Sequence, residues 1–154
     1  MNSRQKTEYT VLYVLIVLGC GLLTAFALTR INTWRIDRSE YYLSEAKKST
    51  SISDQLLLYE QAATLNPSEE TYLGAGITAL KLGDNSLAQR YLSRVKTSEG
   101  YYQLANAYYN LENYSAAIAN YQKSLEIEKG VTARLGLVKS YLKIGDIDLS
   151  LIHI

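Results

Sequence analysis

Residues 101–121 read "YYQLANAYYNLENYSAAIANY" and contain six tyrosines. The spacing of these tyrosines indicates what they do. Tyr101 and Tyr108 are seven positions apart, which is two turns of an α-helix, so both lie on one helical face. Leu104 and Ala105 fall between them on the same face. The first half of the stretch therefore predicts a helix with one apolar face.

The second half predicts another helix after a short break. The break is "LEN" at 111–113. Beyond it, Tyr114, Ala117, Ile118 and Tyr121 recur at intervals of three and four and mark one face. Two short antiparallel helices of this kind form a hairpin that cannot bury its apolar face alone. Most of the tyrosines are therefore interpreted as packing residues, with a hydroxyl left to meet water or a carbonyl.

Similar breaks recur along the chain. "KLGD" at 81–84 and "KIGD" at 143–146 are typical of helix ends, with Gly83 and Gly145 expected in the left-handed conformation that caps a helix. No alternating strand pattern lasts more than a few residues. The sequence predicts an all-α fold.

Residues 98–130 resemble a tetratricopeptide repeat, whose pattern is W-x2-L-G-x2-Y, then A-x3-F, then P. The matching places hold Tyr101 for tryptophan, Leu104, Ala105 for glycine, Tyr108, the pair Ala117 and Tyr121, and Lys129 for proline. The resemblance implies a right-handed α-solenoid of about three and a half repeats over 39–148. The expected repeats are 36–68 with a degenerate first helix, 69–97 with a compressed second helix or turn, 98–130, and the truncated 131–148.

The N-terminal part is different. The 21 residues from Tyr9 to Thr29 carry no charge, and a helix of that length crosses a hydrocarbon core of about 30 Å. We expect a short tail at 1–8, a transmembrane helix at 9–29 and a juxtamembrane linker at 30–38. Two alternatives remain open: cleavage after Ala27, and lipidation of Cys20 in a lipobox-like "VLGC".

The orientation signals conflict. More lysines and arginines follow the apolar segment than precede it, which favours a cytoplasmic domain. A short basic tail before a first apolar segment instead behaves as a signal anchor. We expect a single-pass protein of the cytoplasmic membrane, with the extracytoplasmic side slightly favoured for the soluble domain.

Composition argues against catalysis and nucleic-acid binding. The chain has one histidine, one cysteine and a net charge of +1. It shows neither metal-ligand spacing nor a phosphate-binding glycine loop, and the acidic pair Glu69 and Glu70 is interpreted as a helix start. Between 39 and 148, 11 Lys/Arg oppose 13 Asp/Glu, so no basic surface is expected. We expect no enzyme activity, no cofactor and no nucleic-acid partner.

The resemblance to tetratricopeptide repeats implies a groove, lined by the first helix of each hairpin, that holds a protein or peptide partner. The groove residues expected from it are Leu73, Ile77, Lys81, Tyr102, Asn106, Tyr109, Asn110, Lys139 and Lys143, with Leu80, Leu135 and Leu142 beside them. The three lysines would attract an acidic tail, although the family's two-lysine, two-asparagine carboxylate clamp is not reproduced. The implied function is a bacterial, membrane-anchored scaffold that assembles or stabilises a membrane-associated complex, with self-association possible. The alternative is a secreted or periplasmic repeat protein released after Ala27.

The last six residues, "LSLIHI" at 149–154, are expected not to belong to the natural protein. The DNA string CTGTCTCTTATACACATCT resembles a transposon end used to prepare sequencing libraries, and it translates as these six residues. Such additions are excluded from fold reasoning. On this interpretation His153 has no function and the natural repeat array continues.

Overall fold

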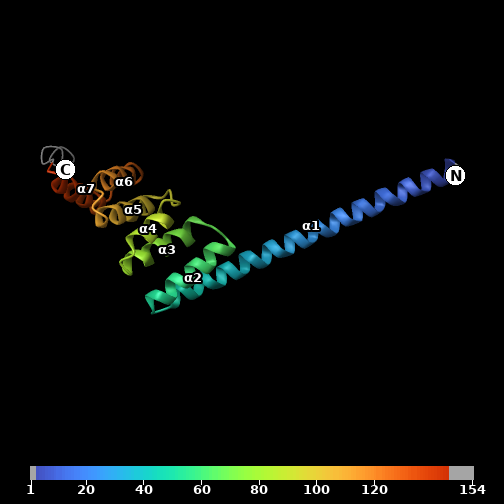
Figure 1. The fold of residues 1–154 in the computed structure, drawn as a ribbon, viewed down its shortest axis with the longest axis horizontal. Helices are drawn as coiled ribbons and strands as arrows, with labels where there is room; N and C mark the ends of the chain where they lie inside the picture. The colour runs from blue at the N-terminus through green and yellow to red at the C-terminus, as the bar shows by residue number, and fades with distance from the viewer. Residues whose placement is uncertain (1–2, 146–154) are drawn as a thin grey trace. The chain divides into compact units, whose positions relative to one another are not determined.

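The computed structural model describes the backbone of residues 3–145 and the side chains of residues 13–145 (Figure 1). Within that range every regular element is an α-helix, which confirms the predicted fold class. The helices are α1 (Ser3–Lys48), α2 (Ile52–Leu65), α3 (Glu69–Lys81), α4 (Asn85–Leu92), α5 (Ser98–Asn110), α6 (Tyr114–Ile127) and α7 (Val131–Ile144). The 149–154 stretch lies outside the described residues. The chain divides into two units between Arg38 and Ser39.

The first unit consists of helix α1 up to Arg38. Its most apolar 18-residue window has a mean hydropathy of 2.1, and none of that window is buried. By length and composition this helix can cross a membrane, although a signal sequence would have the same properties. The hydroxyl groups of Thr24 and Thr29 donate to the carbonyls of Gly21 and Phe26, so both are satisfied within the helix. Residues 30–38, the expected linker, are also helical.

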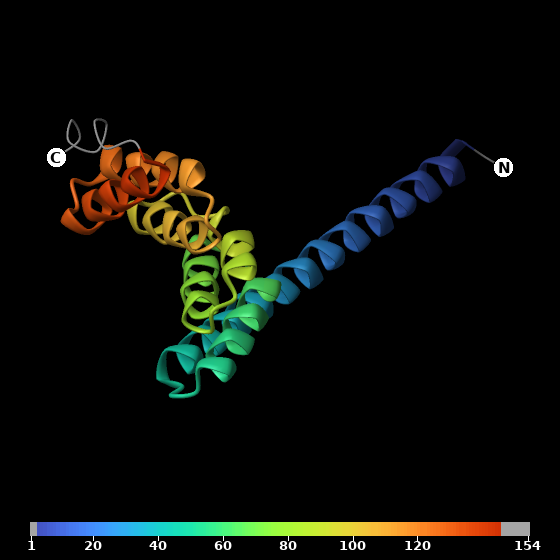
Figure 2. The ribbon, with the colours of Figure 1, turned by 60° about the vertical axis from the view of Figure 1, so that its left-hand side comes forward.

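The second unit begins with a hairpin formed by residues 39–48 of α1 and helix α2, which run side by side (Figure 2). The Ser39 hydroxyl is buried and donates to the Ala62 carbonyl at 3.0 Å. Ala46, two helical turns further along α1, is fully buried. A small polar residue and a small apolar one therefore secure a first helix whose repeat pattern is weak.

Two further hairpins, α3/α4 and α5/α6, follow, and α7 packs on the last of them (Figure 1). Left-handed residues occur at the three breaks that the sequence predicted: Gly83 has φ 81°, Gly145 has φ 79° and Glu112 has φ 59°. The left-handed glycines at Gly83 and Gly145 are thereby confirmed. The second helices then begin with side-chain caps, since Asp84 accepts from the Leu87 amide and Asn113 from the Ala116 amide.

The core of the solenoid consists of two clusters made mostly of small residues. The first joins α3, α4 and α5 through Ala79, Ala88, Leu92, Leu104 and Ala107. The second joins α5, α6 and α7 through Ala105, Ala117, Tyr121, Ala133, Leu137 and Tyr141. The rings of Tyr102, Tyr108 and Tyr109 pack against the second cluster. The tyrosines of 101–121 are thus mainly packing residues, as their spacing predicted.

The repeat predicted to be compressed is indeed short in its second helix. Helix α4 has 8 residues, whereas α2 and α6 have 14 each. The first helices α3 and α5 both have 13 residues. The missing length therefore falls entirely after the turn at Gly83.

Candidate partner-binding site

A cavity of about 280 Å³ opens where the first helices α5 and α7 lie next to each other. We call the surface formed by α3, α5 and α7 the first-helix face. The cavity is lined by Tyr102, Asn106, Tyr109, Tyr121, Thr132, Leu135, Gly136 and Lys139. Four of the nine residues expected in the groove, Tyr102, Asn106, Tyr109 and Lys139, therefore meet at one place.

Tyr121 reaches this cavity from the second helix α6. Its side chain is buried, and its hydroxyl donates to Oδ1 of Asn106 at 2.6 Å. Burial raises the pKa of the Tyr121 phenol, because the charged phenolate would lose its solvation. Gly136 of α7 makes room for the ring, since a Cβ at that position would overlap Tyr121. The cavity wall therefore depends on a glycine on one helix and a tyrosine on another.

The Asn106 amide belongs to a chain of hydrogen bonds along α5. Its Nδ2 donates to Oε1 of Gln103 at 3.1 Å, and Nε2 of Gln103 donates to Oε1 of Glu99 at 2.6 Å. Because Tyr121 already uses Oδ1, Asn106 keeps one N–H and one lone pair for a partner. The interpretation of Asn106 as a residue devoted to binding is therefore incomplete, since it also satisfies a buried hydroxyl.

Several donors at the cavity are unused. Among the described residues, the hydroxyls of Tyr102, Tyr109 and Thr132 and the ammonium of Lys139 have no hydrogen-bond partner. The rings of the two tyrosines nevertheless pack against other aromatic rings. Tyr102 lies against Tyr121 with ring centroids 6.0 Å apart, and Tyr109 meets Tyr114 edge to face at 5.3 Å. The cavity thus presents fixed aromatic walls and free donors.

The other expected groove residues lie elsewhere on the first-helix face. Leu73 and Ile77 of α3 are half-buried, and Lys81 is exposed at the end of that helix. Asn110 is exposed and donates to Oδ1 of Asn85 at 2.9 Å. Lys143 is exposed one turn beyond Lys139 and does not line the cavity.

The sequence reasoning missed Tyr121, Thr132 and Gly136 as cavity residues. The repeat pattern puts Tyr121 at its phenylalanine place and predicts that its ring packs, with the hydroxyl left to meet water or a carbonyl. The hydroxyl that tyrosine adds at this place was the available signal, since a buried phenol needs a partner. Gly136 is required because the ring of Tyr121 fills the space that a Cβ would occupy. This contact joins two helices of different repeats, so the pattern of a single repeat does not predict it.

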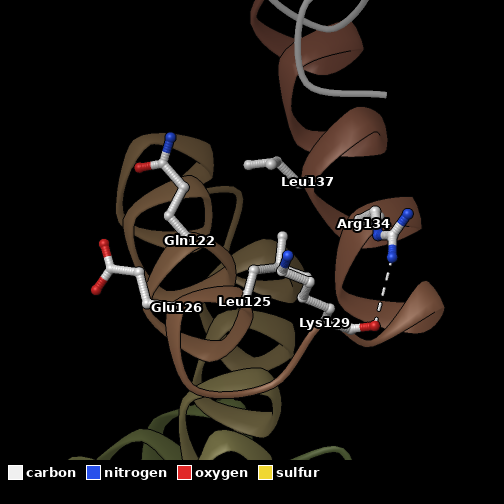
Figure 3. Close-up of a pocket in the computed structure, with 6 residues that line it drawn as sticks. All are labelled: Gln122, Leu125, Glu126, Lys129, Arg134 and Leu137. Carbon is white, nitrogen blue, oxygen red and sulfur yellow. Dashed lines mark hydrogen bonds between the residues drawn. The ribbon is translucent and has the colours of Figure 1, made fainter.

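A second hollow, of about 600 Å³, lies between α6 and α7 (Figure 3). It is lined by Gln122, Leu125, Glu126, Lys129, Arg134 and Leu137. Arg134 donates to the Lys129 carbonyl at 3.4 Å. One repeat earlier Tyr101 holds the place of Arg134, and Lys123 of α6 lies 5.6 Å from its ring centre. The second helix α6 thus reaches the corresponding residue there, and we interpret this hollow as a helix-packing surface.

The acidic pair Glu69 and Glu70 has structural partners. Glu69 accepts the Lys96 amide at 2.7 Å, and Glu70 accepts the Lys47 ammonium at 2.6 Å. Over the side chains that the structure describes, no group of three or more His, Cys, Asp or Glu is close enough to hold a metal ion. Both carboxylates of the pair are therefore engaged in structural contacts.

Comparison with known proteins agrees with this architecture. Residues 98–130 match the tetratricopeptide repeat family model. The crystal structure of MamA superposes with a TM-score of 0.70 at 20% identity, covering 75% of this chain and 68% of that one. The MamA fragment from residue 41 to the end, from Desulfovibrio magneticus RS-1, gives 0.68 at 18%, covering 75% and 71%.

A third structure, YrrB, is described as a TPR protein with an unusual peptide-binding site. It gives a TM-score of 0.62 at 19% identity, covering 77% of this chain and 63% of that chain. No curated protein matches the sequence. At these identities the likeness shows a shared fold.

Proposed function

This chain is a tetratricopeptide-repeat protein, and from that premise we propose that it is a protein-interaction scaffold that holds an extended partner segment on its first-helix face. The α5–α7 cavity is the observation that carries the proposal. It combines rigid tyrosine walls with donors that the described chain leaves unused. Tyrosines supply contact area at low entropic cost, which suits recognition of a flexible segment.

The apolar residues of α3 extend the same surface. Leu73 and Ile77 are half-buried, and Leu73 packs against the first core cluster, so they offer contact area without needing to reorganise. An extended segment that crosses α3, α5 and α7 would meet apolar side chains first and polar ones at the cavity. The description of YrrB as peptide-binding supports this mode for a protein of the same fold.

We further propose that the N-terminal helix anchors the scaffold in the cytoplasmic membrane, with the repeat domain on the extracytoplasmic side. The exposed apolar side chains of its described part support anchoring. The scaffold would then assemble or stabilise a complex at the membrane. The alternative is a released protein that begins at Leu28.

Fractionation separates these two forms. An uncleaved anchor gives the full-length chain in membranes washed with carbonate, whereas release gives a shorter soluble chain whose N-terminal residue is Leu28. A reporter that works only in the cytoplasm, fused after Asp148, tests the orientation. Reporter activity in that fusion would contradict the extracytoplasmic assignment.

Site-specific crosslinking in cells tests the scaffold proposal itself. Benzoylphenylalanine in place of Tyr109 puts the photoreactive group at the cavity, and the same residue in place of the exposed Ser115 on α6 serves as the control. We expect discrete crosslinked species from position 109 only. A product of twice the chain's mass would identify a second copy as the partner. Equal crosslinking from both positions, or none from position 109, would contradict a binding site on the first-helix face.

A further inference from the structure

We infer that the α5–α7 cavity receives an aspartate or glutamate side chain from the partner segment. This inference rests on the proposed function, because it assigns the chemistry of one residue in the segment that the first-helix face holds. It requires a cavity of side-chain size that offers several donors, one of them charged, and holds no carboxylate of its own. Both conditions hold at this place, and the cavity volume is about 280 Å³.

The donors converge from both helices. Tyr102 and Tyr109 contribute phenolic hydroxyls from α5, while Thr132 and Lys139 contribute a hydroxyl and an ammonium from α7. None of the four donates to any described residue. Asn106 adds one remaining N–H, because its other bonds go to Tyr121 and Gln103. A carboxylate accepts at up to about four lone-pair sites, so it can use this set of donors.

The local charge also favours an anion. Helix α7 carries Arg134, Lys139 and Lys143 and has no acidic residue between Val131 and Ile144. The single carboxylate on α5, Glu99, accepts from Gln103 and does not line the cavity. An incoming carboxylate therefore meets Lys139 without a resident competitor. Hydrogen bonds to charged groups are about twice as strong as neutral ones, and partial enclosure by the tyrosine rings strengthens them further.

The same arrangement discriminates against close analogues. An asparagine or glutamine side chain has the shape of the acid but carries no charge. The hydroxyls of the cavity could accept from its NH₂ group, but the Lys139 ammonium can only donate and would lose a charged acceptor. Specificity of this kind comes from the penalty on the wrong ligand as much as from the gain on the right one. The predicted selectivity is therefore for Glu over Gln and Asp over Asn at a single position of the segment.

A bead-bound library of nine-residue peptides, anchored through their C-termini, tests the inference with the full chain in lipid nanodiscs as bait. Anchoring removes the terminal carboxylate, so only side chains can supply the anion. Selected peptides are then made with amidated C-termini, each paired with a variant that has Gln or Asn at the selected acidic position. Affinities are compared for the parent chain, Lys139→Met and Thr132→Val. Both positions are exposed, so neither change should disturb folding.

We expect selected peptides to share an acidic position, and the Gln or Asn variant to bind at least about tenfold more weakly. Lys139→Met should abolish most of the difference between the members of a pair. The matched control, Lys129→Met, removes the same charge beside the α6–α7 hollow and should preserve the difference.

Three results would overturn the inference. If peptides bind on the first-helix face but acid and amide variants bind equally, the carboxylate assignment is wrong while the scaffold function stands. If binding of a Gln variant is restored by a free C-terminus, the cavity holds a terminal carboxylate. If the library yields no binder above empty nanodiscs, both the inference and the proposed peptide binding fail.

Discussion

The hairpins α3/α4 and α5/α6 begin alike and end differently. Their first helices have the same length, and both turns place one residue in the left-handed region before a side-chain cap. Helix α4 then stops after 8 residues and α6 continues for 14. In the shorter repeat, the first helix therefore keeps its full length and the second helix is the one that is shortened.

The shortened repeat loses about one helical turn. Residues 69–97 number 29 and residues 98–130 number 33, a difference of four, which is close to the 3.6 residues of a turn. Removing one turn leaves the remaining side chains on the same face. Gln89 of α4 accordingly donates to the Tyr108 hydroxyl at 3.0 Å, just as Gln122 of α6 donates to that of Tyr141 at 3.2 Å.

The space left by the missing turn is filled from the connection. Val95 lies between α4 and α5 and is almost completely buried. It packs against Gly100 so closely that a Cβ there would overlap its side chain. One valine and one glycine thus replace a turn of helix, and the stacking of the next hairpin is preserved.

The largest expected effect compares the aromatic place of the two hairpins, Tyr121 in α6 and Leu92 in α4. Tyr121→Ala should lower the free energy of unfolding by about 3–5 kcal/mol, and Leu92→Ala by about 2–4 kcal/mol, since each leaves a cavity in a buried cluster. Tyr121 should cost more because its ring spans α5 and α7. Urea-induced unfolding of the full chain in detergent measures both.

The exposed residue Ser115 provides the control for that comparison. Ser115→Ala should change the free energy of unfolding by less than about 0.5 kcal/mol. Equal losses for the Tyr121 and Leu92 variants would show that the long and the compressed hairpin contribute alike to the core.

A second comparison concerns how closely the helices of each hairpin approach. At the glycine place of the repeat, α3 has Gly76 and α5 has Ala105. A Cβ at Gly76 would lie 2.5 Å from Cγ of Leu92, which is fully buried. Gly76→Ala should therefore destabilise by about 1–3 kcal/mol through overpacking, although alanine gains about 1 kcal/mol in helix propensity.

The reciprocal substitution, Ala105→Gly, separates packing from propensity. It removes a methyl group and should cost about 1 kcal/mol or somewhat more. Thermal unfolding followed by circular dichroism compares the two variants. A Gly76→Ala chain more stable than the parent would mean that the α3/α4 hairpin is less tightly packed than the structure indicates.

A third comparison concerns the polar pair of the longer hairpin. Asn106 and Tyr121 are hydrogen-bonded, whereas the corresponding residues of the shorter hairpin, Ile77 and Leu92, are apolar. Asn106→Ala should cost about 1–2 kcal/mol, because the buried phenol loses its acceptor. In a double-mutant cycle with Tyr121→Phe, the double variant should cost about 0.5–1.5 kcal/mol less than the sum of the single variants. Additive losses would show that the bond does not couple the two residues.

Most of the fold could be predicted from the sequence because its signals are local. The three-and-four spacing around Tyr101 and Tyr108 defined a helical face, and Gly83 and Gly145 identified helix ends. Repetition then made the assignment stronger than any single helix could. The compression of 69–97 was visible as a length, but the replacement of a turn by Val95 was not, since it depends on a contact with the next helix.

The cavity was predictable only in part. Tyr102, Asn106 and Lys139 were identified from their places on first helices, which repeat geometry fixes. The role of Tyr121 and the prior engagement of Asn106 were not, because a buried hydroxyl chooses its partner in three dimensions. Residues on different helices come together through packing, and a one-dimensional pattern records only the helix to which each belongs.

The smallest expected effect comes from substituting the left-handed residue in the turn of each hairpin, Gly83 in α3/α4 and Glu112 in α5/α6. Glu112 has φ 59°, a conformation that costs a residue with a side chain about 1 kcal/mol relative to glycine, while Gly83 adopts it without penalty. Glu112→Gly should stabilise by about 0.5 kcal/mol, since the relieved strain is partly offset by the greater freedom of glycine in the unfolded chain. Gly83→Ala should destabilise by about 1 kcal/mol.

Hydrogen exchange at the amides that close the two turns measures both effects. The Asn113 amide donates to the Tyr108 carbonyl, and the Asp84 amide donates to the Ala79 carbonyl. Protection should rise at Asn113 in the first variant and fall at Asp84 in the second. Unchanged protection at both would mean that the caps Asp84 and Asn113, rather than the left-handed residues, determine where each first helix ends.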